Sequence, residues 1–297
     1  MTDQEYLKAV LEDQRLTDDS PEVARLEQVR DDVADLLADE FGSGPELREG
    51  GSKAKGTMIR EDHDLDLPYY VANDDTSVGE TIKEIYENVE AALQTAYKTE
   101  RKGVAVRLLD AEEGSDLSVD VIPGRFTNGD GGDAFLFPSS TAKERVQTNL
   151  ETHVSHVRDS GVVDAICLMK LWRTRRGIEV KTFALELLTI DQLEGHASSS
   201  LPDQLTRVWT EFRDRMDELT ISDPANEHGN DLSEMLDSNV RERLKSEADD
   251  SLRTVEAEGW TAIFGPLAPV EESDRARTDA LRRVATAAPP LVKPWGR

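Results

Sequence analysis

The stretch GGSKAKGTMIREDHDLDL, residues 50–67, combines a glycine-rich turn with two closely spaced carboxylates. Glycine lets the backbone approach a ligand closely and point its N–H groups at an anion, and Ser52 adds a hydroxyl beside them. Asp64 and Asp66 alternate with leucines, which is the period of a half-buried strand. Because residues i and i+2 of a strand share a face, both carboxylates are expected to project the same way. Two hard oxygen ligands beside a phosphate-binding turn favour Mg²⁺-dependent phosphoryl transfer.

A third carboxylate in a similar setting lies further along the chain. The segment LSVDVIP, residues 117–123, alternates polar and apolar residues, which predicts a strand with Asp120 on the opposite face from its valines. Pro123 is expected to end that strand, because proline cannot donate to a sheet ladder. Each motif alone is more often a plain turn or a solvated strand face. Their order and spacing favour one common site.

Together these motifs resemble the signature of the polymerase-beta-like nucleotidyltransferases. That signature consists of Gly-Ser, a short loop with a threonine, Asp-x-Asp, and a third acid on a neighbouring strand. The matching residues in this chain are Gly51, Ser52, Thr57, Asp64, Asp66 and Asp120.

Later segments narrow the resemblance. Lys-x-Trp at residues 170–172 and KTFALELLTI at 181–190 are similar to consecutive segments of the oligoadenylate synthetases, as is DPANEHGN at 223–230. WTAIFG at 260–265 resembles the closing segment of bacterial relatives. Over residues 20–265, the chain therefore resembles the bacterial cGAS/DncV-like nucleotidyltransferases (CD-NTases), in their oligoadenylate-synthetase-like branch.

The resemblance implies an α+β fold with two parts and a metal-dependent site. A polymerase-beta-like core, with a mixed sheet and flanking helices, is expected over residues 1–140, and a helical domain that closes over the nucleotide cleft over residues 141–297. Two Mg²⁺ ions are implied, with Mn²⁺ as a substitute. The residues assigned to catalysis and metal binding are Asp64, Asp66 and Asp120. Those assigned to nucleotide binding are Gly51, Ser52, Lys170, Thr182 and Phe183. Relatives often have tyrosine in place of Phe183, and packing in the core explains this phenylalanine equally well.

The implied reaction joins nucleoside triphosphates, ATP among them, into a cyclic or short linear oligonucleotide second messenger and releases pyrophosphate. The family context is anti-phage (CBASS) signalling. One alternative is a nucleotidyltransferase that acts on an RNA, protein or small-molecule acceptor. A pseudoenzyme that binds a nucleotide without turnover is another, although all three carboxylates are present.

Composition restricts the partners. The net charge of −26 and a pI near 4.5 argue against stable DNA or RNA binding, and they are typical of a salt-adapted surface. The single cysteine, Cys167, excludes an intrachain disulfide and a zinc ribbon, and its apolar surroundings predict burial. The histidines show no ligand set, and a solvated helix face is expected for His153 and His156. Without a signal peptide or a membrane-length apolar run, the expected location is the cytoplasm, with no membrane contact.

Hydrophobic periodicity predicts most of the secondary structure. Ser20-Pro21 is typical of a helix start, and the long helix after it is expected to brace the sheet. Helices are predicted over residues 2–17, 21–41, 77–97, 142–158 and 162–176, and strands over 104–109 and 117–122.

Three features allow two interpretations each. Arg107 faces either solvent or the substrate. The arginines at positions 173, 175 and 176 either hold a triphosphate or form an ordinary amphipathic helix face. The tail after Gly265, with its prolines and Trp295, either binds a partner protein or folds back on the body.

Overall fold

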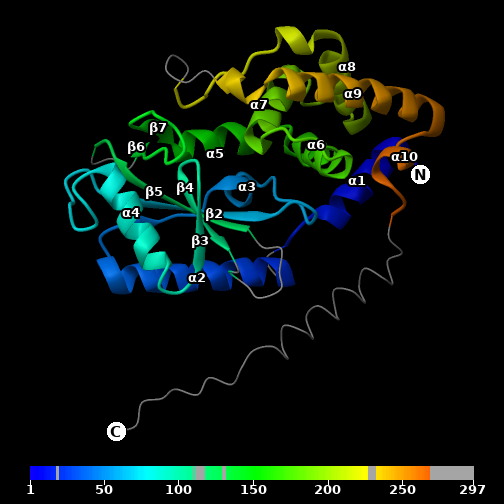
Figure 1. Ribbon diagram of the computed structural model, residues 1–297. Helices are drawn as coiled ribbons and strands as arrows, with labels where there is room; N and C mark the ends of the chain where they lie inside the picture. Colours follow the sequence, from blue (N-terminus) through cyan, green and yellow to red (C-terminus); the bar gives the residue numbers. More distant parts are fainter. Residues whose placement is uncertain (18–19, 110, 112–117, 129–131, 227–231, 268–297) are drawn as a thin grey trace.

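The computed structural model describes residues 1–17, 20–109, 111, 118–128, 132–226 and 232–267. Within them a mixed 7-stranded sheet lies between two layers of helices (Figure 1). Its main path runs β1-β2-β5-β4-β3, and β6 pairs with both β5 and β7. The strands are β1 (Glu46–Leu47), β2 (Asp64–Val71), β3 (Lys98–Lys102), β4 (Ala105–Leu109), β5 (Ser118–Phe126), β6 (Asp133–Leu136) and β7 (Val146–Asn149). The predicted α+β class, a mixed sheet with flanking helices, is confirmed.

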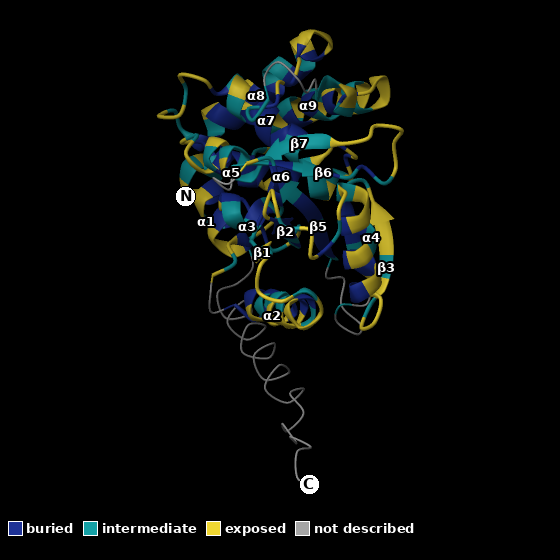
Figure 2. Cartoon of the chain, turned by 90° about the vertical axis from the view of Figure 1, so that its left-hand side faces the viewer, coloured by how far each residue is buried: buried dark blue, intermediate teal, exposed yellow. Residues whose placement is uncertain are grey.

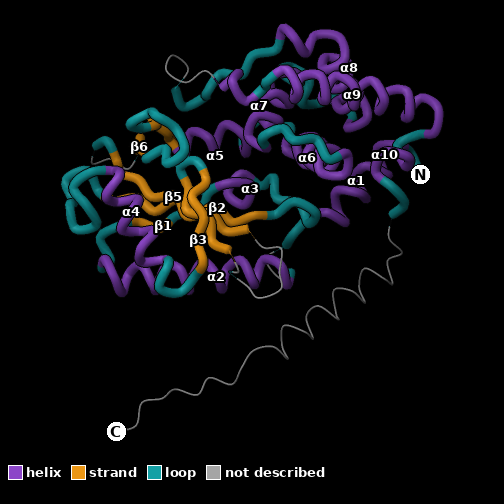
Figure 3. The backbone as a smooth tube through the Cα atoms, viewed as in Figure 1, coloured by secondary structure: helices purple, strands orange, loops and turns teal. Residues whose placement is uncertain are grey.

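Two helices cover one face of the sheet, α2 (Pro21–Phe41) and α4 (Ile82–Leu93) (Figure 3). Ser20 caps α2 by accepting a hydrogen bond from the backbone N–H of Val23. The apolar stripes of both helices pack on alternate residues of β2, β4 and β5 in one core, as the bracing role predicted for the helix over 21–41 requires.

The other helices form a second layer over the opposite face of the sheet (Figure 1). They share a separate hydrophobic core in which Trp172, Trp209 and Trp260 contact one another in series. Figure 2 shows the two buried regions on either side of the sheet. The helices of this layer are α1 (Asp3–Gln14), α5 (Leu150–Arg158), α6 (Val163–Arg176), α7 (Thr182–Gln192), α8 (Leu201–Arg215), α9 (Ser238–Glu258) and α10 (Thr261–Phe264), with 3₁₀ turns at Met216–Glu218 and Leu232–Met235. The short helix α3 (Gly51–Lys55) contacts both β2 and α5, so it joins the sheet to this layer.

The predicted end of one strand was wrong. β5 does not end at Pro123 but continues to Phe126. At Pro123 the described strands provide only β2 as a partner, because pairing with β4 ends at Val121 and pairing with β6 begins at Gly124. This one-sided pairing leaves room for a residue without an N–H.

The helix predicted over residues 142–158 was wrong in its first half. Residues 146–149 form β7, which pairs with β6, and the helix begins only at Leu150. Asn149 both ends the strand and caps α5 by accepting a hydrogen bond from Thr152 N–H at 3.0 Å.

The hydrophobic contacts cross the predicted domain boundary at residue 140. α1 belongs to the core of the helical layer, whereas β7 belongs to the sheet. The two-domain division stays a prediction.

Cys167 is buried as predicted, and burial raises the pKa of its thiol to about 11. No helix among the described residues has the length and apolar character needed to cross a membrane. The C-terminal tail lies outside the described residues.

Candidate active site

The parallel pairing of β2 with β5 places the three predicted carboxylates on one face of the sheet. Asp66 lies beside Asp120, and Asp64 lies beside Ser118. The leucines that alternate with Asp64 and Asp66 are buried in the core on the other face. The carboxylates therefore face the helical layer.

Burial and the charges of neighbouring carboxylates raise the pKa values of Asp64 and Asp66. Burial raises the pKa of Asp66 to about 7, and the charges of Asp64 and Asp120 add to the effect. Burial also raises the pKa of Asp64, while the positive charge of Lys170 opposes the rise. A group of crowded carboxylates with raised pKa values has a high affinity for cations.

Asp120 is the one member of the group that is already neutralised by cations. Nε and Nη2 of Arg107 donate to its two oxygens at 2.7 and 2.8 Å, and Nζ of Lys102 lies 3.3 Å from Oδ2. This bidentate contact decides between the two interpretations of Arg107, because the side chain points into the site.

The glycine turn touches the carboxylates directly. Gly51 has φ +57°, and a Cβ built on it would lie 1.7 Å from Oδ2 of Asp66. Gly50 N–H donates to the Asp66 carbonyl oxygen at 2.9 Å. Ser52 is buried, and its Oγ has no hydrogen-bond partner among the described residues. A buried hydroxyl without a partner beside a close backbone approach suits an anionic ligand.

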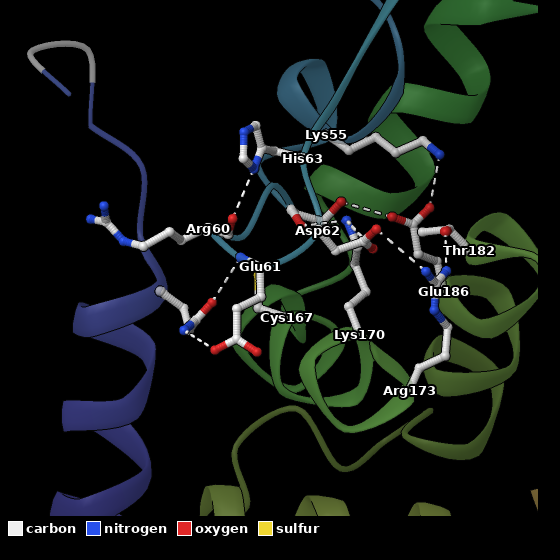
Figure 4. A network of polar contacts seen from close by, with 12 residues as sticks. Lys55, Arg60, Glu61, Asp62, His63, Cys167, Lys170, Arg173, Thr182 and Glu186 are labelled. Carbon is white, nitrogen blue, oxygen red and sulfur yellow. Dashed lines mark hydrogen bonds and ion pairs between the residues drawn. The ribbon is translucent and has the colours of Figure 1, made fainter. Parts of the chain in front are cut away.

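A buried ion pair, which the sequence analysis did not identify, connects the end of this turn to the helical layer. Nζ of Lys55 donates to Glu186 of α7 at 2.8 Å, and Oγ1 of Thr57 donates to the same carboxylate at 2.7 Å (Figure 4). Glu186 is only 1% exposed. The ammonium of Lys55 also lies 4.4 Å from the ring centroid of Phe183. One acid inside the otherwise apolar Ala-Leu-Glu-Leu-Leu segment was the signal for this contact.

Lys170 of α6 and Thr182 of α7, two of the predicted nucleotide-binding residues, lie near this ion pair (Figure 4). Nζ of Lys170 donates to the Thr57 carbonyl oxygen at 2.9 Å and lies 3.9 Å from Asp62. Thr182 accepts a hydrogen bond from Arg173. Phe183 is half-buried, and it packs against the helical core as well as Lys55. Roles for these residues in nucleotide binding stay predictions.

The arginines of α6 are all paired with acidic side chains. Arg173 contacts Asp62 at 3.3 Å, Arg175 contacts Glu61, and Arg176 contacts Asp250 at 2.7 Å. This pairing favours the ordinary structural interpretation of the basic group over direct triphosphate binding.

His153 is not on a solvated helix face, contrary to the expectation. Its Nε2 lies 2.7 Å from Asp223 Oδ1, its side chain is 18% exposed, and its ring centroid is 4.9 Å from that of Phe183. Asp223 also accepts a hydrogen bond from Ala225 N–H at 2.9 Å, so the Asp-Pro-Ala turn is anchored to α5.

The β2–β5 pair, the glycine turn against Asp66 and the helical layer over this face define the polymerase-beta-like nucleotidyltransferase fold, as predicted. No protein-family model and no curated protein sequence matches the chain. Solved structures of bacterial CD-NTases share its fold.

Three of these structures show the extent of the similarity. CdnC of E. coli MS115-1, solved with ATP, has a TM-score of 0.66 and 18% identity over 90% of this chain and 99% of its own. CdnG of Bradyrhizobium diazoefficiens, solved with GTP, has a TM-score of 0.68 and 13% identity over 93% of this chain and 97% of its own. The cyclic AMP-GMP synthase DncV of Vibrio cholerae has a TM-score of 0.60 and 17% identity over 91% of this chain and 86% of its own.

Proposed function

We propose that the protein is a metal-dependent nucleotidyltransferase that joins nucleoside triphosphates into a cyclic or short linear oligonucleotide and releases pyrophosphate. The observation that carries the proposal is the row of Asp64, Asp66 and Asp120 against the turn at Gly51, which continues into Ser52, whose buried hydroxyl has no hydrogen-bond partner in the described part of the chain. The fold shared with CdnC, CdnG and DncV supports it. By the same resemblance, the product is a second messenger in cytoplasmic anti-phage (CBASS) signalling.

The donor triphosphate is proposed to lie against the glycine turn. The backbone of Gly51 and the hydroxyl of Ser52 would hold its phosphates, because Gly51 approaches Asp66 without a side chain between them and the buried Ser52 hydroxyl has no hydrogen-bond partner among the described residues. Lys170 would contribute its positive charge from behind Thr57, since this charge already opposes the rise in the pKa of nearby Asp64 that burial causes. Thr182 and Phe183 are the proposed contacts to the triphosphate and the base.

The three carboxylates fit a hard divalent cation, Mg²⁺ or Mn²⁺. Carboxylate oxygens are the ligands that such ions prefer, and the pKa values of Asp64 and Asp66 are raised by burial and, to a smaller extent, by repulsion from neighbouring carboxylates that a cation would relieve. In the described part of the chain, no three or more His, Cys, Asp or Glu side chains are already gathered for a metal. Asp120 would have to share its oxygens between the metal and Arg107. When bound, the metal would activate the attacking hydroxyl and stabilise the departing pyrophosphate.

ATP and GTP are the proposed substrates, because CdnC was solved with ATP, CdnG with GTP, and DncV is a cyclic AMP-GMP synthase. The helical layer is proposed to close over the nucleotide, since it lies over the carboxylate face and contacts the turn through Glu186.

Pyrophosphate release tests this function. The purified protein with Mg²⁺ and mixed ATP, GTP, CTP and UTP should release pyrophosphate without any added acceptor. Asp66→Asn should reduce the rate by at least about a hundredfold, since losing a metal ligand removes several kcal/mol of charge stabilisation. Lys83→Met, on the opposite face of the sheet, serves as the matched control and should keep the wild-type rate. Release only after addition of an RNA, protein or small-molecule acceptor would favour the alternative transferase, and no release would favour a pseudoenzyme.

A further inference from the structure

The face that carries the carboxylates continues past Asp120 onto β4 and the edge strand β3. Arg107 of β4 lies beside Asp120, and Glu100 of β3 lies beside Arg107. Side chains alternate between faces along a strand, so Lys102, two residues after Glu100, projects to the same face. The acidic row that begins at Asp66 is therefore followed by positive side chains, in a chain whose net charge is −26.

These cations differ from the other lysines of the site in their access to solvent. The Lys102 side chain is 47% exposed although its Nζ lies 3.3 Å from Asp120. Lys55 and Lys170 are only 11% and 1% exposed, and both are held by protein oxygens. Arg107 is 24% exposed. The flexible four-carbon stem of Lys102 lets its ammonium reach a ligand placed above the sheet.

The two substrates of a nucleotidyl transfer approach the carboxylates from opposite sides. The proposed donor phosphates lie against Gly51 and Ser52, next to Asp66. The attacking oxygen and the leaving pyrophosphate are roughly in line at the transferred phosphorus. The acceptor therefore approaches from the side of Asp120, over β5 and β4, where Lys102 and Arg107 lie.

We propose that Lys102, supported by Arg107, binds phosphate groups of the acceptor nucleotide. The inference rests on the proposed function and adds the side chain that recognises the phosphates of the acceptor nucleoside triphosphate. An acceptor of this kind brings several negative charges to an acidic protein, so it needs a local countercharge. An exposed ammonium on the acceptor side supplies that charge, and an ammonium pairs well with phosphate as a compact point charge.

The test uses acceptors that cannot serve as donors. With saturating 2′,3′-dideoxy-ATP or 2′,3′-dideoxy-GTP as donor, which has no ribose hydroxyl and cannot act as an acceptor, the rate of dinucleotide formation is measured against two acceptors of the same base. One is the α,β-methylene triphosphate, whose bond between the α-phosphorus and carbon is not cleaved, and the other is the nucleoside without phosphates. The wild type should have a lower KM for the triphosphate acceptor. Lys102→Met should raise that KM about tenfold, as the loss of one charge-assisted contact predicts, and leave the KM for the nucleoside and for the donor unchanged.

Two further variants keep the test decisive. Lys102→Arg should restore the preference for the triphosphate acceptor, and Lys83→Met, an exposed lysine on α4 with 60% exposure, should not alter it. Equal changes in KM for both acceptors would mean that Lys102 acts only through Asp120, and they would overturn the inference. Unchanged kinetics in a variant that still forms dinucleotide would also overturn it while leaving the proposed function intact. Absence of any dinucleotide from the wild type would reject both.

Discussion

Gly51 lies so close to Asp66 that no side chain fits between them. Its positive φ of +57° alone would be tolerated in other residues at a cost of about 1 to 2 kcal/mol. The 1.7 Å approach of a Cβ to the Asp66 oxygen would not be tolerated without movement of the carboxylate or the turn. The same glycine thus determines the backbone of the turn and the position of one proposed metal ligand.

Gly51→Ala should therefore reduce activity by more than its effect on stability can explain. A displacement on the order of 1 Å at a reacting group can reduce the rate on the order of a hundredfold, and we expect a loss of that size in pyrophosphate release. Gly56→Ala is the matched control, because Gly56 also has positive φ, +73°, but its Cβ would have nothing within 4 Å. Similar activities of the two variants, at similar Tm, would contradict the geometry described for Gly51.

The raised pKa of Asp66 predicts a pH-dependent effect on stability. The folded protein holds the Asp66 proton up to about pH 7, whereas an aspartate has an ordinary pKa of 3.8. Between these values the folded state binds more protons, so its free energy of unfolding falls as the pH rises. Asp66→Asn cannot ionise, and its Tm in EDTA should exceed that of the wild type above about pH 7 and equal it below about pH 4.

Asp120→Asn is the comparison for this measurement, with the opposite expected sign. It removes the counterion of Arg107 and Lys102, so it should lower the Tm near neutral pH. If the Tm of the wild type and of Asp66→Asn change in parallel at every pH, ionisation of Asp66 does not destabilise the folded protein.

At the scale of elements, one buried ion pair joins α3 to α7. Because Glu186 is 1% exposed and holds both Lys55 and Thr57, it couples the phosphate-binding turn to the helical layer. Removing one partner of a buried pair leaves the other charge uncompensated, which costs more than replacing both partners.

Glu186→Gln should lower the free energy of unfolding by about 3 to 5 kcal/mol. The double variant Lys55→Met, Glu186→Gln should be more stable than this single variant, as urea denaturation followed by circular dichroism can measure. Asp214→Asn, which breaks an exposed pair with Arg213, should leave the urea denaturation curve almost unchanged, because surface ion pairs contribute little to stability. A double variant less stable than Glu186→Gln would rule out the coupling.

The sequence predicted the elements whose pattern is local. Strict alternation around Asp64 and Asp120 indicated β2 and β5, and Ser20-Pro21 indicated the start of α2. β3 was missed because its five residues, KTERK, are mostly exposed and carry no apolar alternation. β6 and β7 were missed because they are short and stabilise each other as a pair.

Local sequence patterns could not predict contacts between residues that are far apart in the sequence. Lys55 and Glu186 are separated by 131 positions, and His153 and Asp223 by 70. The lone acid in the apolar Ala-Leu-Glu-Leu-Leu segment indicates that Glu186 has a buried partner, but the local sequence does not indicate that this partner is Lys55. The local sequence likewise does not pair His153 with Asp223. The carboxylate row was accessible from sequence because parallel strands bring equivalent positions of two alternating segments together.

At the scale of the whole molecule, the acidic composition dominates. With a net charge of −26, the acidic side chains repel one another in the folded protein. Salt weakens this repulsion, because the screening length falls from about 10 Å at 0.1 M to about 3 Å at 1 M. The same charge disfavours nucleic-acid partners, so the positive side chains at the carboxylate site stand out against it.

The Tm should rise as KCl increases from about 0.1 to about 1 M. A variant with four exposed acids neutralised, Asp35→Asn, Asp39→Asn, Glu256→Gln and Glu258→Gln, should show a smaller rise, because less repulsion remains to be screened. A Tm that falls with KCl, or an equal rise in the variant, would rule out self-repulsion as the cause.

Asp64, Asp66 and Asp120 are proposed to catalyse the joining of nucleoside triphosphates to one another. The most direct measurement incubates the protein with Mg²⁺ and labelled triphosphates, singly and mixed, treats the products with phosphatase, and resolves them by chromatography with mass spectrometry. We expect an oligonucleotide, resistant to phosphatase if cyclic, that is absent with the double variant Asp64→Ala, Asp66→Ala. No oligonucleotide and no pyrophosphate, at both low and high salt, would contradict it.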